Sequence, residues 1–340
     1  MNIQTINKWT NSFNQFLSKY GKYLLLIGIC LLFVMPFLPI ATFLVMRISV
    51  LVMIYSTLAL ALNILTGYTG LVSIGHVMFF GFGAYTSALL VTKLNINFFI
   101  AFFIAILLSA LLGVLASLPT LRLGGAYLSI ATLGFAEVFK IILINWKNIT
   151  NGVMGVKNIP RPEIFGLTLT PENKGLYFLI LIIMLVSSII CYLIINSKIG
   201  RAFRSIKEDE LAATLMGINT TYYKTLAFSV SAGITGAVGA YYAHFMRYID
   251  PNTFTIDTSI LILSMVILGG LGTMRGMYLG AFILVLLPQI SRWLESYRFV
   301  IYGLILILIM EFRPQGLLGW EPKSPYRFPK GVKTNENETV

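Results

Sequence analysis

The sequence predicts an all-α fold, a polytopic transmembrane helical bundle of about ten membrane segments that include short or broken helices. Hydrophobic residues make up 57% of the 340 residues and charged residues 11%, and the mean hydropathy is +0.83. A soluble domain of ordinary composition needs far less apolar content to fill its core. Successive apolar runs occupy most of the chain, so no separate soluble domain is expected.

The apolar runs have the length that a bilayer requires, because ~20 residues of helix cross a hydrocarbon core of ~30 Å. The longer predicted spans cover residues 23–40, 42–62, 66–92, 98–118, 124–146, 176–195 and 225–246. The shorter predicted spans cover residues 258–271, 277–290 and 299–312. The first run lacks an obvious small-residue cleavage site and is followed at once by the next, which favours a retained span over a secretory signal.

Basic residues predict the orientation of these spans. An even number of crossings places both termini on one side, where Lys and Arg outnumber those opposite by roughly two to one, and such an excess marks the cytoplasm. The expected organisation is a cytoplasmic segment 1–22, a transmembrane domain 23–312 and a cytoplasmic tail 313–340. Within the domain, we expect a cytoplasmic loop at 197–224 and an extracytoplasmic loop at 147–175.

The net charge of +12 does not indicate nucleic-acid binding. The basic residues lie singly at the ends of apolar runs, as topology determinants do, and form no phosphate-binding stripe. Both cysteines, Cys30 and Cys191, lie inside apolar runs. The sequence therefore predicts neither a disulfide framework nor a metal site.

Two apolar runs, 66–85 and 268–280, are rich in glycine. A broken helix is tolerated in a membrane only where its backbone is buried in protein or lines a cavity, and interrupted segments in two halves of a chain indicate a transport path. Close helix packing is the alternative at each glycine, and it is the favoured interpretation for 231–240, where small residues recur every four positions. The candidate path residues are Asn63, Ser73, His76, Gly81 and Gly270.

Ionisable residues at membrane depth have structural alternatives to a functional role. His76 is a path candidate, but a bond to a neighbouring backbone group explains a buried histidine equally well. Glu137 and Lys140 lie three residues apart, a spacing at which they are expected to pair on one helix face.

A compact block of charge interrupts the apolar chain between residues 201 and 210. Two apolar stripes at helical spacing, rotated relative to each other, predict two short helices that meet at residues 207–209. Asp209 is a suitable N-cap for the second helix, and Gly217 stands where a glycine ends a helix. Acidic and basic residues balance, which disfavours binding to anionic lipid, so a surface for another protein is preferred over a solvated linker. The stripes consist of Ile199, Phe203 and Ile206, then Leu211, Leu215 and Ile218.

The stretch ELAATLMGIN (210–219), preceded by GRAFRSIKED, resembles the cytoplasmic coupling loop of bacterial ABC-importer permeases. Further stretches resemble one family in the same order: LNILTGYTGLVSIGHVMFFGFGAYTSALL, LRLGGAYLSIATLGFAEVFK, GVKNIPRPEIFG, GGLGTMRGMYLGAFILVLLP and YGLILILIMEFRPQGLLG. That family is the LivM-type permease subunit of branched-chain amino-acid ABC importers. The chain lacks the charged residue near 124–126 and the proline near 277–278 that members often carry.

The resemblance implies a transport subunit without a catalytic centre, and the sequence contains no GxxxxGK[ST] loop that would bind ATP. ATP with Mg²⁺ is then expected on two cytoplasmic LivG/LivF-like ATPases that contact the coupling loop. The other implied partners are a paralogous LivH-like second permease, an extracytoplasmic substrate-binding protein and the lipid of a bacterial inner membrane. The implied coupling residues are Arg204, Glu208, Asp209, Glu210, Ala213 and Gly217.

Alternatives stay open at this point. Leucine, isoleucine and valine are the expected substrates, but importers of urea or short-chain amides have permeases of the same kind. An ion-coupled secondary transporter needs buried acids, and only Glu137 lies well inside a predicted span. An integral membrane enzyme needs clustered acids or histidines, and the sequence offers only His76 and His244.

Overall fold

The computed structural model describes residues 32–37, 42–120, 125–164, 167–170, 174–290, 298–313 and 315–319. Within them, 7 helices are long and apolar enough to cross a membrane, and two shorter apolar helices follow. The predicted all-α bundle is thus confirmed. The segment 1–22, most of the predicted span 23–40 and most of the tail 313–340 lie outside the described residues.

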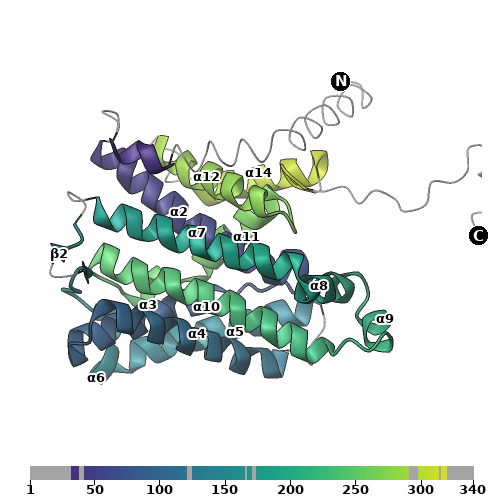
Figure 1. Ribbon diagram of the computed structural model, residues 1–340, viewed down its shortest axis with the longest axis horizontal. Helices are drawn as coiled ribbons and strands as arrows, with labels where there is room; N and C mark the ends of the chain where they lie inside the picture. The colour runs from purple at the N-terminus through teal and green to yellow at the C-terminus, as the bar shows by residue number, and fades with distance from the viewer. Residues whose placement is uncertain are drawn as a thin grey trace, which may run out of the picture.

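Shorter elements connect some of the long helices, with the longest connections at residues 146–174 and 197–219 (Figure 1). They are α2 (Phe43–Asn63), α3 (Val77–Leu94), α4 (Phe98–Thr120), α5 (Ala126–Asn145), α7 (Gly175–Asn196), α10 (Thr220–Met246), α11 (Ile256–Gly269), α12 (Met274–Ile290) and α14 (Arg298–Phe312). The shorter helices are η1 (Met35–Phe37), η2 (Ile64–Tyr68), α6 (Lys147–Thr150), η3 (Gly152–Met154), α8 (Lys198–Glu208), α9 (Glu210–Leu215) and η4 (Pro251–Thr253). Between α6 and α7, β1 (Glu163–Ile164) and β2 (Leu167–Thr168) form a small antiparallel hairpin.

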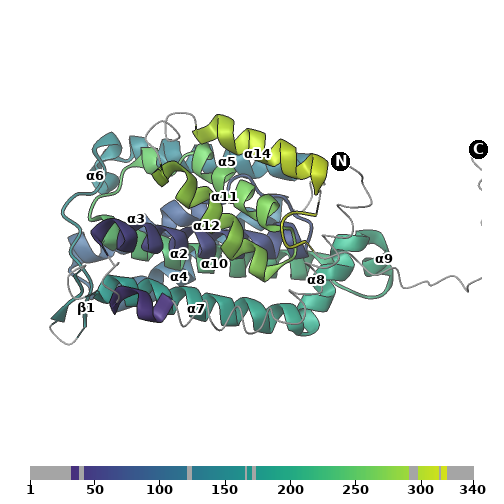
Figure 2. The same cartoon turned by 90° about the horizontal axis from the view of Figure 1, so that it is seen from above.

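Helices α2 and α10 form the centre of the bundle, and 78% of the apolar window of each is buried. Helix α10 packs against α3 and α4, whereas α2 packs against α12, α7 and α11, and the two central helices contact each other. The views in Figures 1 and 2 show these long helices lying roughly along one direction. The bundle therefore consists of two groups of helices that meet where α2 contacts α10.

Small residues allow α10 to approach its neighbours closely, as expected for 231–240. Every residue of that stretch is buried. A Cβ atom added to Gly83 of α3 would lie 2.3 Å from the carbonyl oxygen of Gly236, and one added to Gly239 would lie 2.1 Å from the carbonyl oxygen of Phe80. The helix backbones are thus in direct contact, which only glycine permits at these positions.

The first glycine-rich run is broken, but the break differs from the predicted span 66–92. Helix α2 continues into η2, a π-helical turn, and residues 69–76 are not helical before α3 begins. Gly70 has a φ of +75° in this break, whereas Gly81 and Gly83 lie inside regular helix. The composition of the run predicted a break correctly, yet it did not distinguish glycines that permit a turn from glycines that permit close packing.

The second glycine-rich run is also broken, at residues 270–273, between α11 and α12. Gly270 and Gly272 have φ values of +110° and +79°, a region that favours glycine because it has no Cβ. Both glycine-rich runs thus interrupt helices, as the sequence predicted, and each break contains buried as well as exposed residues.

The predicted loops lie at opposite ends of the bundle (Figure 1). Helices α8 and α9 lie at one end, and α6 and the hairpin lie at the other. The second end is tied to the body by paired backbone hydrogen bonds between Val156 and Ile249, of 2.9 and 3.1 Å. The arrangement agrees with loops 197–224 and 147–175 on opposite sides of a membrane.

Candidate functional site

Helices α8 and α9 with the following turn, residues 198–219, form a compact projection that we call the knob. Its first helix begins at Ser197, whose hydroxyl accepts a hydrogen bond of 3.1 Å from the amide of Ile199. Asp209 separates the two helices, and its carboxylate accepts a hydrogen bond of 2.9 Å from the amide of Ala212. The prediction of two short helices with Asp209 as the N-cap is confirmed.

Gly217 ends the second helix through a Schellman motif. Its φ is +82°. The amide of Ile218 donates to the carbonyl of Ala213, and the amide of Gly217 donates to the carbonyl of Thr214, each over 3.0 Å. This pair of bonds satisfies carbonyl groups that a helix end leaves free. Caps at three points therefore make the knob a defined structure rather than a flexible linker.

The two helices of the knob differ in the burial of their apolar residues. Helix α8 buries Phe203 and Ile206 against the bundle, as its predicted stripe suggests, and the ring of Phe203 lies 6.4 Å from that of Tyr223. Helix α9 instead leaves apolar side chains in solvent: Leu211, Leu215 and Met216 are 72%, 80% and 83% exposed. We call these three residues the α9 patch.

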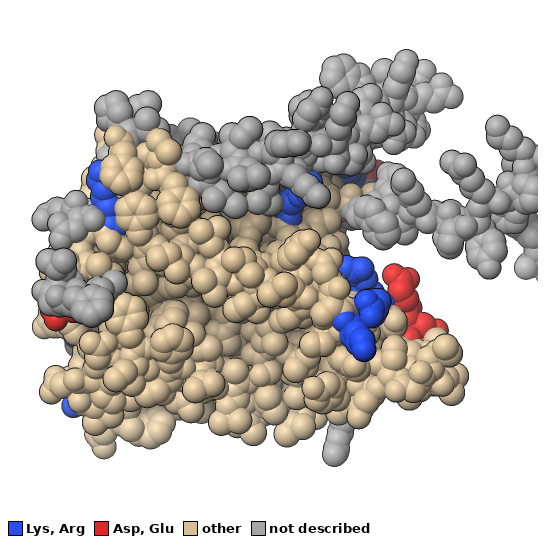
Figure 3. Space-filling view, in the orientation of Figure 1, with Lys and Arg blue, Asp and Glu red and all other residues tan. Residues whose placement is uncertain are grey.

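Charged residues lie on the same projection as the α9 patch. Arg204, Glu208 and Asp209 are exposed, whereas Ala213 is buried. Figure 3 shows acidic and basic side chains gathered at the end of the bundle where α8 and α9 lie, beside a largely uncharged flank. An exposed apolar patch on a projection that also carries charged residues is typical of a protein interaction site.

Glu210 is engaged within the chain, although the sequence suggested it as a contact for an ATPase. Its carboxylate forms an ion pair with Lys224 near the start of α10. Lys224 is buried, whereas the Glu210 side chain is 54% exposed. The pair ties α9 to the central helix, and Lys224 is a site residue that the sequence analysis missed because nothing local marks its partner.

Asn63 joins the two broken segments. It is buried at the end of α2, and its side-chain oxygen accepts a hydrogen bond of 2.9 Å from the amide of Gly272. Its side-chain nitrogen donates to the carbonyl of Thr273 over 3.3 Å. The candidate residues Asn63 and Gly270 are therefore brought into one region, because Gly270 begins the same break.

His76 and Ser73 lie in the first break and are fully buried. The Nε2 atom of His76 lies 2.7 Å from the hydroxyl of Thr235 and 3.4 Å from that of Ser231, both on α10. The partners are thus side chains of the central helix rather than neighbouring backbone. Among the described residues, neither Nδ1 of His76 nor the hydroxyl of Ser73 has a hydrogen-bond partner.

The surroundings of Gly81, and those of Glu137 and Lys140, differ from the sequence-based predictions. Gly81 lies on α3, where an added Cβ would approach the rings of Phe139 and Phe254 to 2.9 and 3.0 Å, so its position is one of close packing. In the described part of the chain, Glu137 and Lys140 do not form the expected ion pair with each other. A spacing of three residues permits such a pair but does not enforce it.

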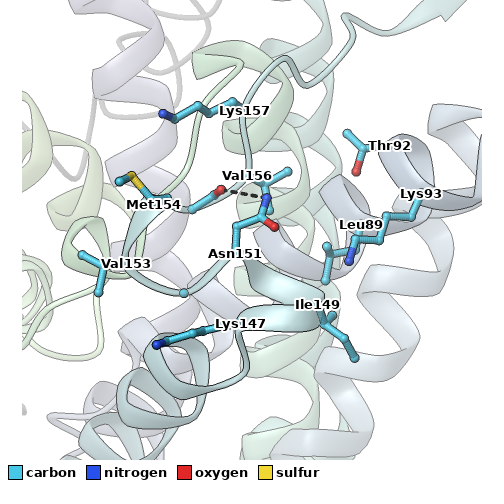
Figure 4. Close-up of a pocket in the computed structure, with 12 residues that line it drawn as sticks. Leu89, Thr92, Lys93, Lys147, Ile149, Asn151, Val153, Met154, Val156 and Lys157 are labelled. Atoms are coloured by element: carbon cyan, nitrogen blue, oxygen red, sulfur yellow. Dashed lines mark hydrogen bonds between the residues drawn. The ribbon is translucent and has the colours of Figure 1, made fainter.

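A pocket of about 790 Å³ lies at the end of the bundle opposite the knob. Figure 4 shows that residues from the end of α3, from α6 and from the loop at 151–157 line it. Lys93, Lys147 and Lys157 are among these residues, and no described lining residue is acidic. The Lys93 ammonium group donates to the carbonyl of Asn148 over 2.8 Å. The mouth of the pocket is therefore basic.

Comparison with known proteins is consistent with this arrangement. Residues 44–310 match the family described as "Branched-chain amino acid transport system / permease component". The high-affinity branched-chain amino acid transport system permease protein LivM of Salmonella typhimurium is 34% identical, over 84% of this chain and 74% of its own length. The LivH permease of the Escherichia coli system is 24% identical, over 78% of this chain and 91% of its own length. No solved structure matches.

Proposed function

Because the chain belongs to the family of permease components of branched-chain amino acid transport systems, we propose that it forms one half of a path through which an ABC importer moves leucine, isoleucine and valine. It is a LivM-like multi-pass membrane protein, and its role is transport rather than catalysis. The observation that carries the mechanism is the knob, a capped structure with an exposed apolar patch at one end of the bundle.

Two cytoplasmic LivG/LivF-like ATPases bind ATP with Mg²⁺ in this proposal, and one of them receives the knob. The α9 patch supplies apolar side chains on one helix face, which suits a groove on a partner. The exposed residues Arg204, Glu208 and Asp209 lie on the same projection and fix the orientation of docking through their charges. Glu210 acts indirectly by holding α9 to Lys224.

A paralogous LivH-like permease supplies the other half of the path. The similarity of this chain to both LivM and LivH relatives supports two related subunits that pack face to face. An extracytoplasmic binding protein delivers the substrate at the other end of the bundle. The lysines around the pocket in Figure 4 suit an acidic surface on that protein.

In this proposal the knob lies in the cytoplasm of a bacterial inner membrane, where ATP is, and the ten crossings predicted from the sequence place both termini on the same side. Single cysteines at Ser205 and Asn158, in a background without Cys30 and Cys191, test this orientation because both positions are exposed. In intact cells, an impermeant maleimide is expected to label position 158 and not 205, and permeabilised cells should show both. Labelling of position 205 in intact cells would contradict the orientation.

Reconstitution tests the function and its alternatives. In proteoliposomes, this chain with its partner permease, both ATPases and the binding protein is expected to accumulate leucine only with ATP and Mg²⁺, and the chain alone should accumulate none. Uptake of urea or acetamide in place of leucine would change the substrate. Robust uptake by the chain alone, driven by a proton or sodium gradient, would instead show a secondary transporter.

A further inference from the structure

The first helix break lies directly against the knob. The π-helical turn η2 ends at Tyr68, and π-helical turns within helices often mark functional positions. Near such an end, backbone carbonyl groups lose their helical partners. The carbonyl of Gly67 finds one outside its own segment, on α8.

Lys207 supplies that partner. It lies in the last turn of α8, and its ammonium group donates a hydrogen bond of 2.8 Å to the carbonyl oxygen of Gly67. Its Cγ atom lies 3.3 Å from the place where a Cβ on Gly70 would stand. One turn earlier on α8, the guanidinium carbon of Arg204 lies 5.9 Å from the centre of the Tyr68 ring. The last turns of α8 thus rest on the first break.

The same glycine contacts the second break. A Cβ on Gly67 would lie 2.4 Å from the amide nitrogen of Gly272, and one on Gly272 would lie 3.2 Å from the carbonyl oxygen of Gly67. Asn63 ties these backbones together through its bonds to Gly272 and Thr273. Gly67 therefore contacts both interrupted segments, so that a shift of Gly67 acts on both.

Arg204 contacts the first break through its guanidinium group over the Tyr68 ring, and within the described residues the remaining charged side chains of α8 form no hydrogen bond with a break. Lys198, Arg201 and Glu208 are exposed, as is Lys207 itself, and the guanidinium group of Arg204 donates to the carbonyl of Ile195 at the end of α7 over 3.4 Å. In the described part of the chain, Lys207 is the α8 side chain that forms a hydrogen bond with a helix break.

We propose that Lys207 is the positioning residue that transmits movement of the knob to the two helix breaks. This inference rests on the proposed function, in which ATPases move the knob. A shift of α8 changes the position of the Lys207 ammonium group, and Gly67 follows because its carbonyl is bound to that group. Each position of the knob then favours a different arrangement of the two helix breaks. Coupling requires such a difference in contacts between two states.

Three variants of the reconstituted complex test the proposal. Lys207→Met keeps the unbranched stem beside Gly70 and removes the donor, Lys207→Arg keeps a donor, and Lys198→Met removes an exposed lysine from the same helix. Leucine uptake and ATP hydrolysis are measured in the same vesicles, together with assembly of the complex. For Lys207→Met, uptake per ATP is expected to fall about tenfold, within the range typical of coupling between sites. Assembly and ATP hydrolysis should be retained, Lys207→Arg should recover most of the uptake, and Lys198→Met should match the unmodified complex.

Hydrogen–deuterium exchange provides a readout that does not need transport. In purified Lys207→Met, amides 69–76 are expected to exchange at least about fivefold faster, while those of α10 stay protected. Unchanged uptake per ATP, or unchanged exchange at 69–76, would overturn the proposal, as would a parallel loss of assembly and hydrolysis. If the unmodified complex imports no leucine, the proposed function fails and the exchange of 69–76 alone decides the role of Lys207.

Discussion

Replacement of Gly217 by valine is expected to abolish coupled transport while the complex keeps its membrane helices folded. Gly217 has a φ of +82°, and nothing lies within 4 Å of an added Cβ. Space is therefore no obstacle, and the cost is purely conformational. A β-branched residue in the left-handed region costs roughly 1–2 kcal/mol or more. The backbone is expected to relieve that strain by leaving the turn that ends α9.

Loss of this turn acts on the knob because the turn holds its geometry. The bonds from Gly217 to Thr214 and from Ile218 to Ala213 are expected to break together, since both need the left-handed residue. The α9 patch then loses its fixed direction relative to α8. An ATPase that docks on a misdirected patch moves it without moving α8, so hydrolysis continues and import stops.

Gly217→Asn is the matched control, because asparagine tolerates the left-handed region best after glycine. Leucine uptake, ATP hydrolysis and capture of the ATPases by the membrane subunits are measured for both variants. Gly217→Asn should stay close to the unmodified complex. Normal uptake by Gly217→Val would show that the knob is a linker whose shape does not matter.

The structure of the knob was predictable from the sequence because its determinants are local. A capping carboxylate acts over three residues, and a left-handed glycine ends a helix within one turn. Asp209 and Gly217 therefore revealed their roles without any knowledge of the rest of the chain. The two apolar stripes were also predictable, but nothing local indicated that α8 buries its stripe and that α9 does not.

Contacts between distant segments were not predictable in this way. Nothing in the sequence distinguishes Lys224 from Lys207. In the structure, Lys224 pairs with Glu210, whereas Lys207 binds the carbonyl of Gly67. His76 finds its hydroxyl partners on α10, more than 150 positions away. Such pairings depend on how helices cross, and helix crossings follow from packing of whole faces rather than from a local motif.

Glycine is the clearest example of one residue type with several structural roles. Gly70 permits a turn, Gly217 ends a helix, and Gly83 permits two helices to touch. All three glycines support the same prediction, a position that does not accommodate an ordinary side chain. Only the surrounding fold decides whether the obstacle is the backbone conformation or a neighbouring atom.

Gly83→Ala is expected to destabilise the whole bundle, since Gly83 lies at a point where the backbones of α3 and α10 are in direct contact. The new Cβ atom would lie 2.3 Å from the carbonyl oxygen of Gly236, on a backbone that has no side chain to move aside. The helices must separate, and their shared packing is lost along their length. Overpacking of this kind costs typically 1–3 kcal/mol, and direct pressure on backbone places it at the upper end or above.

Gly303→Ala in α14 is the control, because nothing lies within 4 Å of an added Cβ there. Alanine is a better helix former than glycine by up to ~1 kcal/mol, so the same substitution should stabilise the protein at position 303 and destabilise it at 83. Thermal loss of monodisperse protein in detergent measures both. Equal thermal stability of the two variants would mean that α3 and α10 do not touch through Gly83 and Gly236. Opposite shifts would locate the close contact of α3 with the same helix that carries Thr235 and Ser231, the partners of His76.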